Sequence, residues 1–171
     1  MNEVIKNMME RRSIKKYLPQ QISDAELQDI LTAGRYAPTG RDRQPLAFVI
    51  VQDAETISVL SAMNAEILGT SADPFYGAPT VVLVLAKADV STRVEDGSLA
   101  IGNMMLAAHS IGVGSCWVHR AREMFASEKG RELLKKWGIE GEWQGVGCCL
   151  LGYSDAPQKQ ASERRSLVVR V

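Results

Sequence analysis

The sequence has no excess of either charge and few aromatic residues, and each shortage excludes a class of partner. Twenty Lys and Arg residues balance twenty Asp and Glu residues, so no overall field attracts nucleic acid or an anionic membrane. Aromatic residues make up 6% of the chain, and few of them interleave with its basic cluster, as base stacking would require. We therefore expect neither nucleic acid nor a membrane as a partner, and any anion site must be local.

Cysteines are also scarce, and their spacing excludes a disulfide framework. The chain has three, of which Cys148 and Cys149 are adjacent, and none forms a CxxC pair. The first twelve residues mix charged with apolar side chains, unlike a signal peptide. The longest nearly uncharged stretch, residues 97–118, contains Asn103 and His109, so we interpret it as a buried helix and strand rather than a membrane span. These features predict a reduced, cytoplasmic protein without a structural metal.

Helix-like and strand-like patterns alternate along the 171 residues, of which 46% are hydrophobic. That content suffices for the core of one domain, which we expect to span residues 1–171. Helices are predicted over about 2–12, from residue 23 to before Pro38, from Asp53, over about 96–111 and before Gly138. Strands are predicted over 47–51, 80–86, 115–118, 146–151 and 167–171, with a connector at 157–160. The order of elements indicates an α+β sandwich of helices around one sheet.

Three of these elements carry more specific expectations. Ser23 can cap a helix while Glu26 reaches back to it, and Ile22 can pack on Leu27 as a hydrophobic staple. The segment 80–86 is apolar and β-branched throughout, as a central strand covered on both faces would be. The helix over 96–111 is apolar almost all round, which predicts a core helix.

The familiar catalytic signatures are missing from the chain. It has no GxSxG, no HExxH, no Walker loop and no glycine-rich dinucleotide turn. With two histidines and no Ser/His/Asp or Cys/His set, nucleophilic catalysis has little support. If the protein is an enzyme, we expect a cofactor to supply the reactivity.

The densest polar cluster, residues 11–16, lies where a helix gives way to an extended segment. Because side chains alternate in extended chain, Arg11, Ser13 and Lys15 can point one way and converge on a single anion. A guanidinium, a hydroxyl and an ammonium group together suit a phosphate monoester. Taken alone, the cluster also fits a solvated basic turn.

Two further features could contribute to a site. Asn64 shares a helical stripe with Ile57, Leu60 and Ile67, and a polar residue on an inward face needs a partner, which an ordinary structural hydrogen bond would also provide. The loop at residues 37–45 contains two prolines, a glycine and Gln44, a combination that exposes backbone amides. In isolation, this segment is also compatible with a simple connecting loop.

Five segments together resemble the successive motifs of nitroreductase-type flavoproteins, from about residue 5 to 167. They are RRSIKKYLP, YAPTGRDRQPLAFVIV, FYGAPTVVLVLA, EDGSLAIGNMMLAAHSIGVGSCWVHRA and GVGCCLLGYSDAPQKQASERRSL. The resemblance implies a nitroreductase-like sandwich with a central, mostly antiparallel sheet, in a homodimer with FMN at the interface. It also implies ping-pong electron transfer from NADH or NADPH to a nitroaromatic, quinone or similar small acceptor.

The same resemblance implies which residues bind FMN, and it assigns no catalytic side chain because the flavin carries the chemistry. The residues matching the phosphate and ribityl end are Arg11, Arg12, Ser13 and Lys15, completed by Arg164 or Arg165. The residues matching the flavin contacts are Gln44 and Asn64, with Pro38, Thr39 and Gly40 from the opposite subunit. Those matching the backbone beside the isoalloxazine and its N5 are Trp117, Val118, His119 and Arg120. For His119, the resemblance implies that the backbone amide contacts the isoalloxazine, so the side chain could face solvent.

The chain departs from the family pattern at two places. Asp42 stands where the family often has Asn, and Leu46 replaces a Trp. The connection from Asn64 to Phe75 is short, which predicts that a helical insert covering the flavin in larger relatives is absent and that the pocket is more open. Two alternatives remain: a same-fold enzyme with other flavin chemistry, such as reductive dehalogenation or flavin destruction, and a non-catalytic FMN-binding protein.

Overall fold

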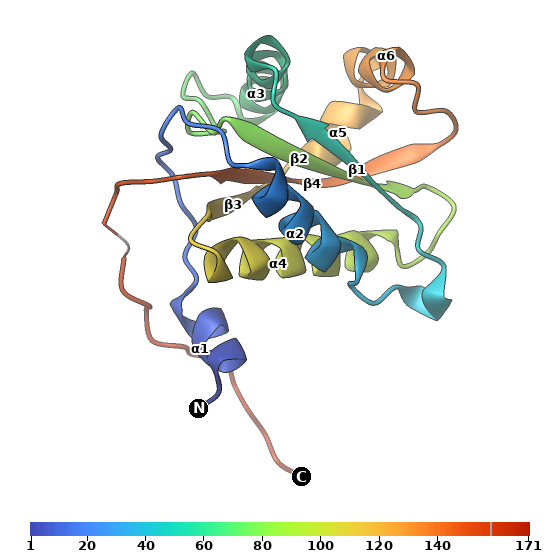
Figure 1. The fold of residues 1–171 in the computed structure, drawn as a ribbon. Helices are drawn as coiled ribbons and strands as arrows, with labels where there is room; N and C mark the ends of the chain where they lie inside the picture. The colour runs from blue at the N-terminus through green and yellow to red at the C-terminus, as the bar shows by residue number, and fades with distance from the viewer. Residues whose placement is uncertain (158) are drawn as a thin grey trace.

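A four-stranded sheet lies between two layers of helices in the computed structural model (Figure 1), which describes residues 1–157 and 159–171. The helices α3 (Ala54–Leu68), α5 (Ala121–Ala126) and α6 (Glu128–Lys136) cover one face. The helices α2 (Asp24–Arg35) and α4 (Arg93–Ser110) cover the other, and α1 (Glu3–Glu10) lies beyond α4. This arrangement is the α+β sandwich that the sequence predicts. Gln158, within the predicted connector 157–160, lies outside the described residues.

The strands run in the order β1-β2-β4-β3, and every pair of neighbours is antiparallel. Their bounds are Leu46–Val51 for β1, Thr80–Lys87 for β2, Gly114–Val118 for β3 and Trp143–Gly152 for β4. The predicted central strand is confirmed, because β2 pairs on both sides and is buried from Thr80 to Ala86. Beside the edge strand β3, Ser13 forms a parallel bridge with Ser115, so the segment after α1 extends the sheet.

The alternation of side chains along β2 produces two cores, one on each face of the sheet. Leu83 and Leu85 pack on the side of α3, α5 and α6, whereas Val82 and Val84 pack on the side of α2 and α4. Close approach between layers requires glycine at Gly145, where a Cβ would collide with the backbone carbonyl of Ala121 in α5. Both faces of the sheet are therefore closely packed against helices, which fixes the positions of β3 and β4.

The predicted start of α2 is confirmed in detail. Ser23 is the N-cap, its Oγ accepts from the Glu26 amide at 3.3 Å, and the Glu26 carboxylate accepts from the Ser23 amide at 2.8 Å. Ile22 and Leu27 are both buried, as a staple requires. The Tyr153 hydroxyl donates to the same carboxylate at 2.7 Å, so the capping box also ties α2 to the chain after β4.

Ser23→Ala is expected to lower the free energy of unfolding by about 1 kcal/mol at neutral pH, the usual cost of losing such a cap. The hydroxyl of Ser23, followed by that of Tyr153, lowers the pKa of Glu26. A lowered carboxyl pKa gives stability that is present above the unfolded-state pKa and is lost as the pH falls through the folded-state pKa. Urea unfolding at neutral and acid pH measures the free energy of unfolding of both proteins. The difference in this free energy between wild type and Ser23→Ala should become smaller in acid. A difference independent of pH would contradict the role of the carboxylate.

Three sequence predictions about elements are wrong. Residues 167–171 form no strand and are exposed, because an extended segment becomes a strand only when another edge pairs with it. Ile67 is not on the buried stripe of α3, because the last turn of that helix projects into solvent. The apolar helix predicted over 96–111 lies in the core on one side only, since Ile101 and Met104 of α4 are buried while Leu99 is 49% exposed.

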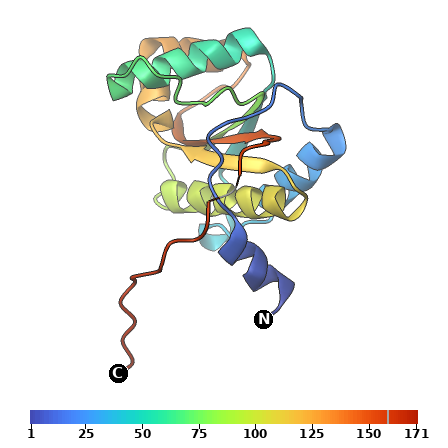
Figure 2. The same cartoon turned by 90° about the vertical axis from the view of Figure 1, so that its left-hand side faces the viewer.

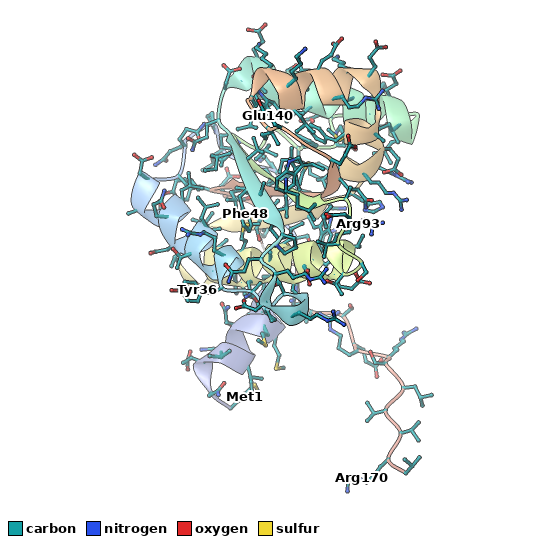
Figure 3. All side chains as sticks on the ribbon, turned by 90° about the vertical axis from the view of Figure 1, so that its right-hand side faces the viewer. Met1, Tyr36, Phe48, Arg93, Glu140 and Arg170 are labelled. Carbon is teal, nitrogen blue, oxygen red and sulfur yellow. The ribbon has the colours of Figure 1, made fainter. Side chains whose placement is uncertain are left out.

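Apolar surface therefore remains uncovered in the single chain. In α1 the exposed apolar side chains are Val4, Ile5, Met8 and Met9, and in the last residues they are Leu167, Val168, Val169 and Val171. Figure 3 shows Met1 and Arg170, near the two chain ends, far out on the side of α4. Among the described residues, we find no helix with both the length and the apolar character of a membrane span.

Candidate functional site

The extended segment after α1 has the alternation that the sequence predicts. The helix ends at Arg11, whose amide donates to the Asn7 carbonyl at 3.0 Å. The chain then runs along β3, with the Ile14 amide donating to the Ser115 carbonyl at 2.9 Å. Ile14 is buried while Ser13 and Lys15 are exposed, so successive side chains face opposite ways.

The side chains of Arg11, Ser13 and Lys15, here called the Arg11 cluster, gather around the thiol of Cys116 in β3. Burial raises the pKa of this thiol, while Lys15, a hydrogen bond from Ser13 and the charge of Arg11 all act to lower it. The three groups predicted to converge on one anion therefore share one location, with Cys116 beneath them.

Two buried polar atoms at this location find no hydrogen-bond partner in the part of the chain that the structure describes. They are Nη1 of Arg11 and the hydroxyl of Tyr17. Burial raises the pKa of the Tyr17 hydroxyl well above its usual value. Lys15 Nζ lies 5.5 Å from the ring centroid of Tyr76, which makes a cation–π contact. A buried guanidinium nitrogen without an acceptor indicates a site that an anion would complete.

Arg12, which the resemblance assigns to the same end of the cofactor, faces the other way. Its Nη1 donates to the carbonyls of Met9 at 2.8 Å and Arg11 at 2.6 Å, and its Nε donates to the Lys159 carbonyl at 3.2 Å. These bonds hold the end of α1 against the chain that follows β4. In this structure Arg12 is thus separated from the Arg11 cluster.

Asn64 connects α3 to the segment after β3. Its side chain is completely buried, and Nδ2 donates to the carbonyl of His119 at 2.7 Å. Its Oδ1 has no hydrogen-bond partner among the described residues. The sequence is compatible with either a structural hydrogen bond or a ligand contact for Asn64. The structure shows the structural hydrogen bond through Nδ2, and Oδ1 could still accept a hydrogen bond from a ligand.

Residues 117–120 form the turn from β3 into α5. Val118 is buried, Trp117 is half-buried on the opposite face, and the side chain of His119 is exposed. Arg120 has a φ of 80°, and its Nη1 pairs with Glu123 Oε1 at 2.9 Å. Left-handed backbone at a residue other than glycine is strained and is often found at functional sites. The bond from Asn64 helps to hold this turn in place.

We expect Asn64→Leu to lower the free energy of unfolding by about 1 to 3 kcal/mol, because the His119 carbonyl loses its buried donor. Ser61→Ala in the same helix provides a matched control, since that hydroxyl bonds to Asp73 at the exposed surface. Chemical denaturation of both variants measures the difference. Equal stability of Asn64→Leu and wild type would show that the turn does not depend on Asn64.

The loop at residues 38–44 is held at the start of α4. The Gly40 amide donates to Asp96 Oδ1 at 2.9 Å, and the Gln44 amide donates to Thr39 Oγ1 at 3.1 Å. A 3₁₀ turn, η1, spans Gly40–Asp42. Three residues other than glycine have positive φ here, namely Arg41, Asp42 and Gln44. Several strained residues in one exposed loop are a second indication of a functional segment, and Asp96, which sequence reasoning did not single out, fixes it.

The predicted site residues fall into separate groups in the single chain. Figure 1 shows η1 beside the start of α4 and the segment after α1 beside its end. Asp96, which binds the loop, and His109, which lies beside Arg12, are thirteen residues apart, or about 20 Å along the helix axis. Arg164 and Arg165 are exposed in the tail, which runs away from the sheet (Figure 2). The segment that carries the Arg11 cluster lies beside the end of α4 and residues 38–44 lie beside its start, so these two groups are far apart.

Comparisons with known proteins agree with this fold. A model of the nitroreductase family matches residues 8–153. An Archaeoglobus fulgidus protein, provisionally described as an NADH dehydrogenase/NAD(P)H nitroreductase, is 36% identical over 121 residues, which are 69% of this chain and 68% of that protein. An FMN reductase [NAD(P)H] of Bacillus subtilis is 28% identical over 138 residues, or 67% of this chain and 53% of that protein.

The structural comparison extends over the whole chain. A nitroreductase from Bacteroides fragilis, solved with bound FMN, superposes with a TM-score of 0.91 at 27% identity and covers 100% of both chains. An FMN-dependent nitroreductase from Clostridium difficile has a TM-score of 0.90 at 24% identity over 99% of both chains, which supports the fold. The family match and these likenesses show that the chain belongs to the nitroreductase family, a family of oxidoreductase enzymes.

Proposed function

We propose that this chain binds FMN and uses NADH or NADPH to reduce a nitroaromatic, quinone or similar small acceptor by a ping-pong mechanism. The observation that carries the proposal is the Arg11 cluster, in which a buried guanidinium nitrogen has no acceptor among the residues that the structure describes. The FMN bound to the Bacteroides fragilis relative and the donor in the names of the curated relatives support it. Those curated relatives are only partly covered by the match, so donor and acceptor are proposed by analogy.

The residues present fit the phosphate end of FMN. Arg11, Ser13 and Lys15 offer a guanidinium, a hydroxyl and an ammonium group, which make charge-assisted hydrogen bonds to phosphate oxygens. A phosphate would provide the acceptor that Arg11 Nη1 lacks. Cys116, whose pKa is raised by burial, would remain a neutral thiol beneath the phosphate and add no repulsive charge.

Residues 117–120 would hold the ring end. When bound, FMN supplies the redox chemistry, taking a hydride from the nicotinamide and passing electrons to the acceptor. Asn64 fixes the carbonyl of His119, so the backbone of this turn keeps one orientation. A preorganised backbone N–H in the turn would stabilise negative charge on the reduced ring. Because the backbone makes this contact, no side chain is proposed as a general acid or base.

A second copy of the chain would complete the site. Within one chain, the 38–44 loop cannot complete the Arg11 cluster, since it is held at the opposite end of α4. The uncovered apolar side chains of α1, α4 and the tail supply a surface for association. Two-fold symmetry would then bring Pro38, Thr39 and Gly40 to the partner's flavin, and Arg164 or Arg165 to a phosphate end.

The pocket over the ring would be open. The connection from α3 to β2, residues 69–79, contains turns and no helix, as the sequence predicts. A small lid or none is compatible with acceptors of different shapes. This openness supports a broad class of flat, electron-poor acceptors over one closely fitted substrate.

The absorbance spectrum of the purified protein, followed by identification of the released chromophore, tests cofactor binding. Anaerobic mixing with NADPH, and separately with NADH, should then bleach the oxidised flavin band, and adding a nitroaromatic or a quinone should restore it. A band that persists with both donors would indicate a binding protein without hydride transfer. Flavin fragments or released halide in place of simple reoxidation would indicate one of the other flavin chemistries.

A further inference from the structure

A small polar pocket lies beside the extended segment that carries the Arg11 cluster. It has a volume of about 170 Å³ and forms where residues 12–14 cross the end of α4 and the chain leaving β4. Its polar side chains are Arg12, His109, Ser115 and Ser154. None of these four belongs to the Arg11 cluster, and we call this cavity the Ser115 pocket.

Ser115 is the strongest sign that the pocket binds something. The residue is 2% exposed, and its Oγ has no hydrogen-bond partner among the described residues. On β3 it alternates with Cys116, which packs in the core on the α3 side, whereas Val113 and Trp117 pack on the α4 side. The hydroxyl of Ser115 therefore faces α4 and the pocket. A buried hydroxyl seldom remains unbonded, so a ligand or water is needed here.

The other polar groups of the pocket are donors. Ser154 Oγ accepts from the Ala156 amide at 3.2 Å, which leaves its own O–H free to donate. An imidazole brings at least one N–H in either protonation state, and the guanidinium of Arg12 is held in place by its bonds to backbone carbonyls. Charge and donors thus converge from three segments of the chain.

Acceptors that would oppose an anion are absent from the described lining. No carboxylate lines the pocket, and the nearby Asp155 pairs with Lys16 at 3.5 Å. Two carbonyls at the end of α4 are occupied, since those of Ala108 and His109 accept from the amides of Val113 and Gly112. These hydrogen bonds reduce the negative potential that the carbonyls at the helix end would otherwise present to an anion.

We propose that the Ser115 pocket binds a small oxyanion, of the class of phosphate, sulfate or a carboxylate. Its volume is far above the roughly 10 to 15 Å³ that one water needs, yet below the roughly 300 Å³ at which pockets for larger ligands begin. The bound oxyanion would join α4, β3 and residues 12–14, and so would stabilise the segment that carries the Arg11 cluster. The inference does not depend on which cofactor that cluster binds.

Binding of inorganic sulfate and phosphate to the full chain tests the proposal. The protein is first saturated with FMN so that the Arg11 cluster is filled, and each anion is titrated calorimetrically at constant ionic strength against chloride. We expect one saturable site that Ser115→Ala and His109→Gln each weaken by about 3- to 10-fold, the effect of one lost hydrogen bond. Ser110→Ala is the matched control, because Ser110 is next to His109 but bonds to the Ala107 carbonyl outside the pocket.

Two outcomes would overturn the proposal. One is a titration with no saturable site, which would mean that the pocket holds water. The other is equal weakening by Ser110→Ala and Ser115→Ala, which would mean that the anion binds elsewhere. If the protein does not take up FMN, the same titration is carried out on Arg11→Ala without flavin, so failure of the proposed function and failure of this site give different results.

Discussion

Arg11→Ala is expected to weaken FMN binding by about 10- to 150-fold while leaving riboflavin binding nearly unchanged. Hydrogen bonds to a charged group contribute about 1.5 to 3 kcal/mol each, and about 1.4 kcal/mol is a factor of ten in affinity. Nη1 of Arg11 is buried and has no acceptor in the described part of the chain, and riboflavin has no phosphate to provide one. Fluorescence titration of both flavins against the apoprotein measures the two affinities.

Arg43→Ala provides the control for this comparison. Arg43 has the same charge but is exposed in the loop at the far end of α4, so both flavins should bind that variant with similar changes. Arg12→Ala adds a second comparison, because the guanidinium of Arg12 donates to backbone carbonyls. We expect this variant to have a lower free energy of unfolding and to change FMN and riboflavin binding by the same factor. If Arg11→Ala weakens FMN and riboflavin by the same factor, the Arg11 cluster is structural.

Sequence signals of short range predicted the fold well. The capping box of Ser23 and Glu26 involves neighbours in the chain, and the apolar run of β2 records burial on both faces, so neither needs knowledge of distant contacts. The alternation of Arg11, Ser13 and Lys15 is also local, and the structure brings the three together. That they bind a phosphate stays a prediction.

Features that depend on distant contacts were not predictable from the sequence. Residues 167–171 have strand-like composition, but whether they pair depends on meeting a free strand edge, and in this structure they meet none. Alternation in β3 puts Cys116 and Val118 on one face, yet only the folded chain shows that the Arg11 cluster lies close to Cys116. The positive φ of Arg120 has no sequence signal, because glycine, not arginine, is the usual residue in that conformation.

The separation between the Arg11 cluster and the 38–44 loop leads to a complementation experiment with two inactive variants. Arg11→Ala combined with Lys15→Ala disables the cluster, and Gly40→Val disables the loop, since a Cβ at Gly40 would lie 2.5 Å from Thr92 Oγ1. Each variant alone should bind little FMN and show little activity. If every site combines one subunit's cluster with its partner's loop, a mixed dimer contains one site in which both parts are intact.

Equal amounts of the two variants, unfolded and refolded together, should therefore recover about one quarter of the wild-type sites, because half of the dimers are mixed and each has one intact site. Bound FMN and NADPH-dependent turnover per protein measure the recovery. As a control, Arg11→Ala/Lys15→Ala is mixed with a second cluster variant, Ser13→Val, a pair that should recover nothing beyond the sum of its parts. Recovery must also fall when the refolding mixture is diluted below the concentration at which dimers form. If mixing cluster and loop variants gives no gain although mixed dimers are present, each site is built from one chain, and the position of the 38–44 loop requires a different explanation.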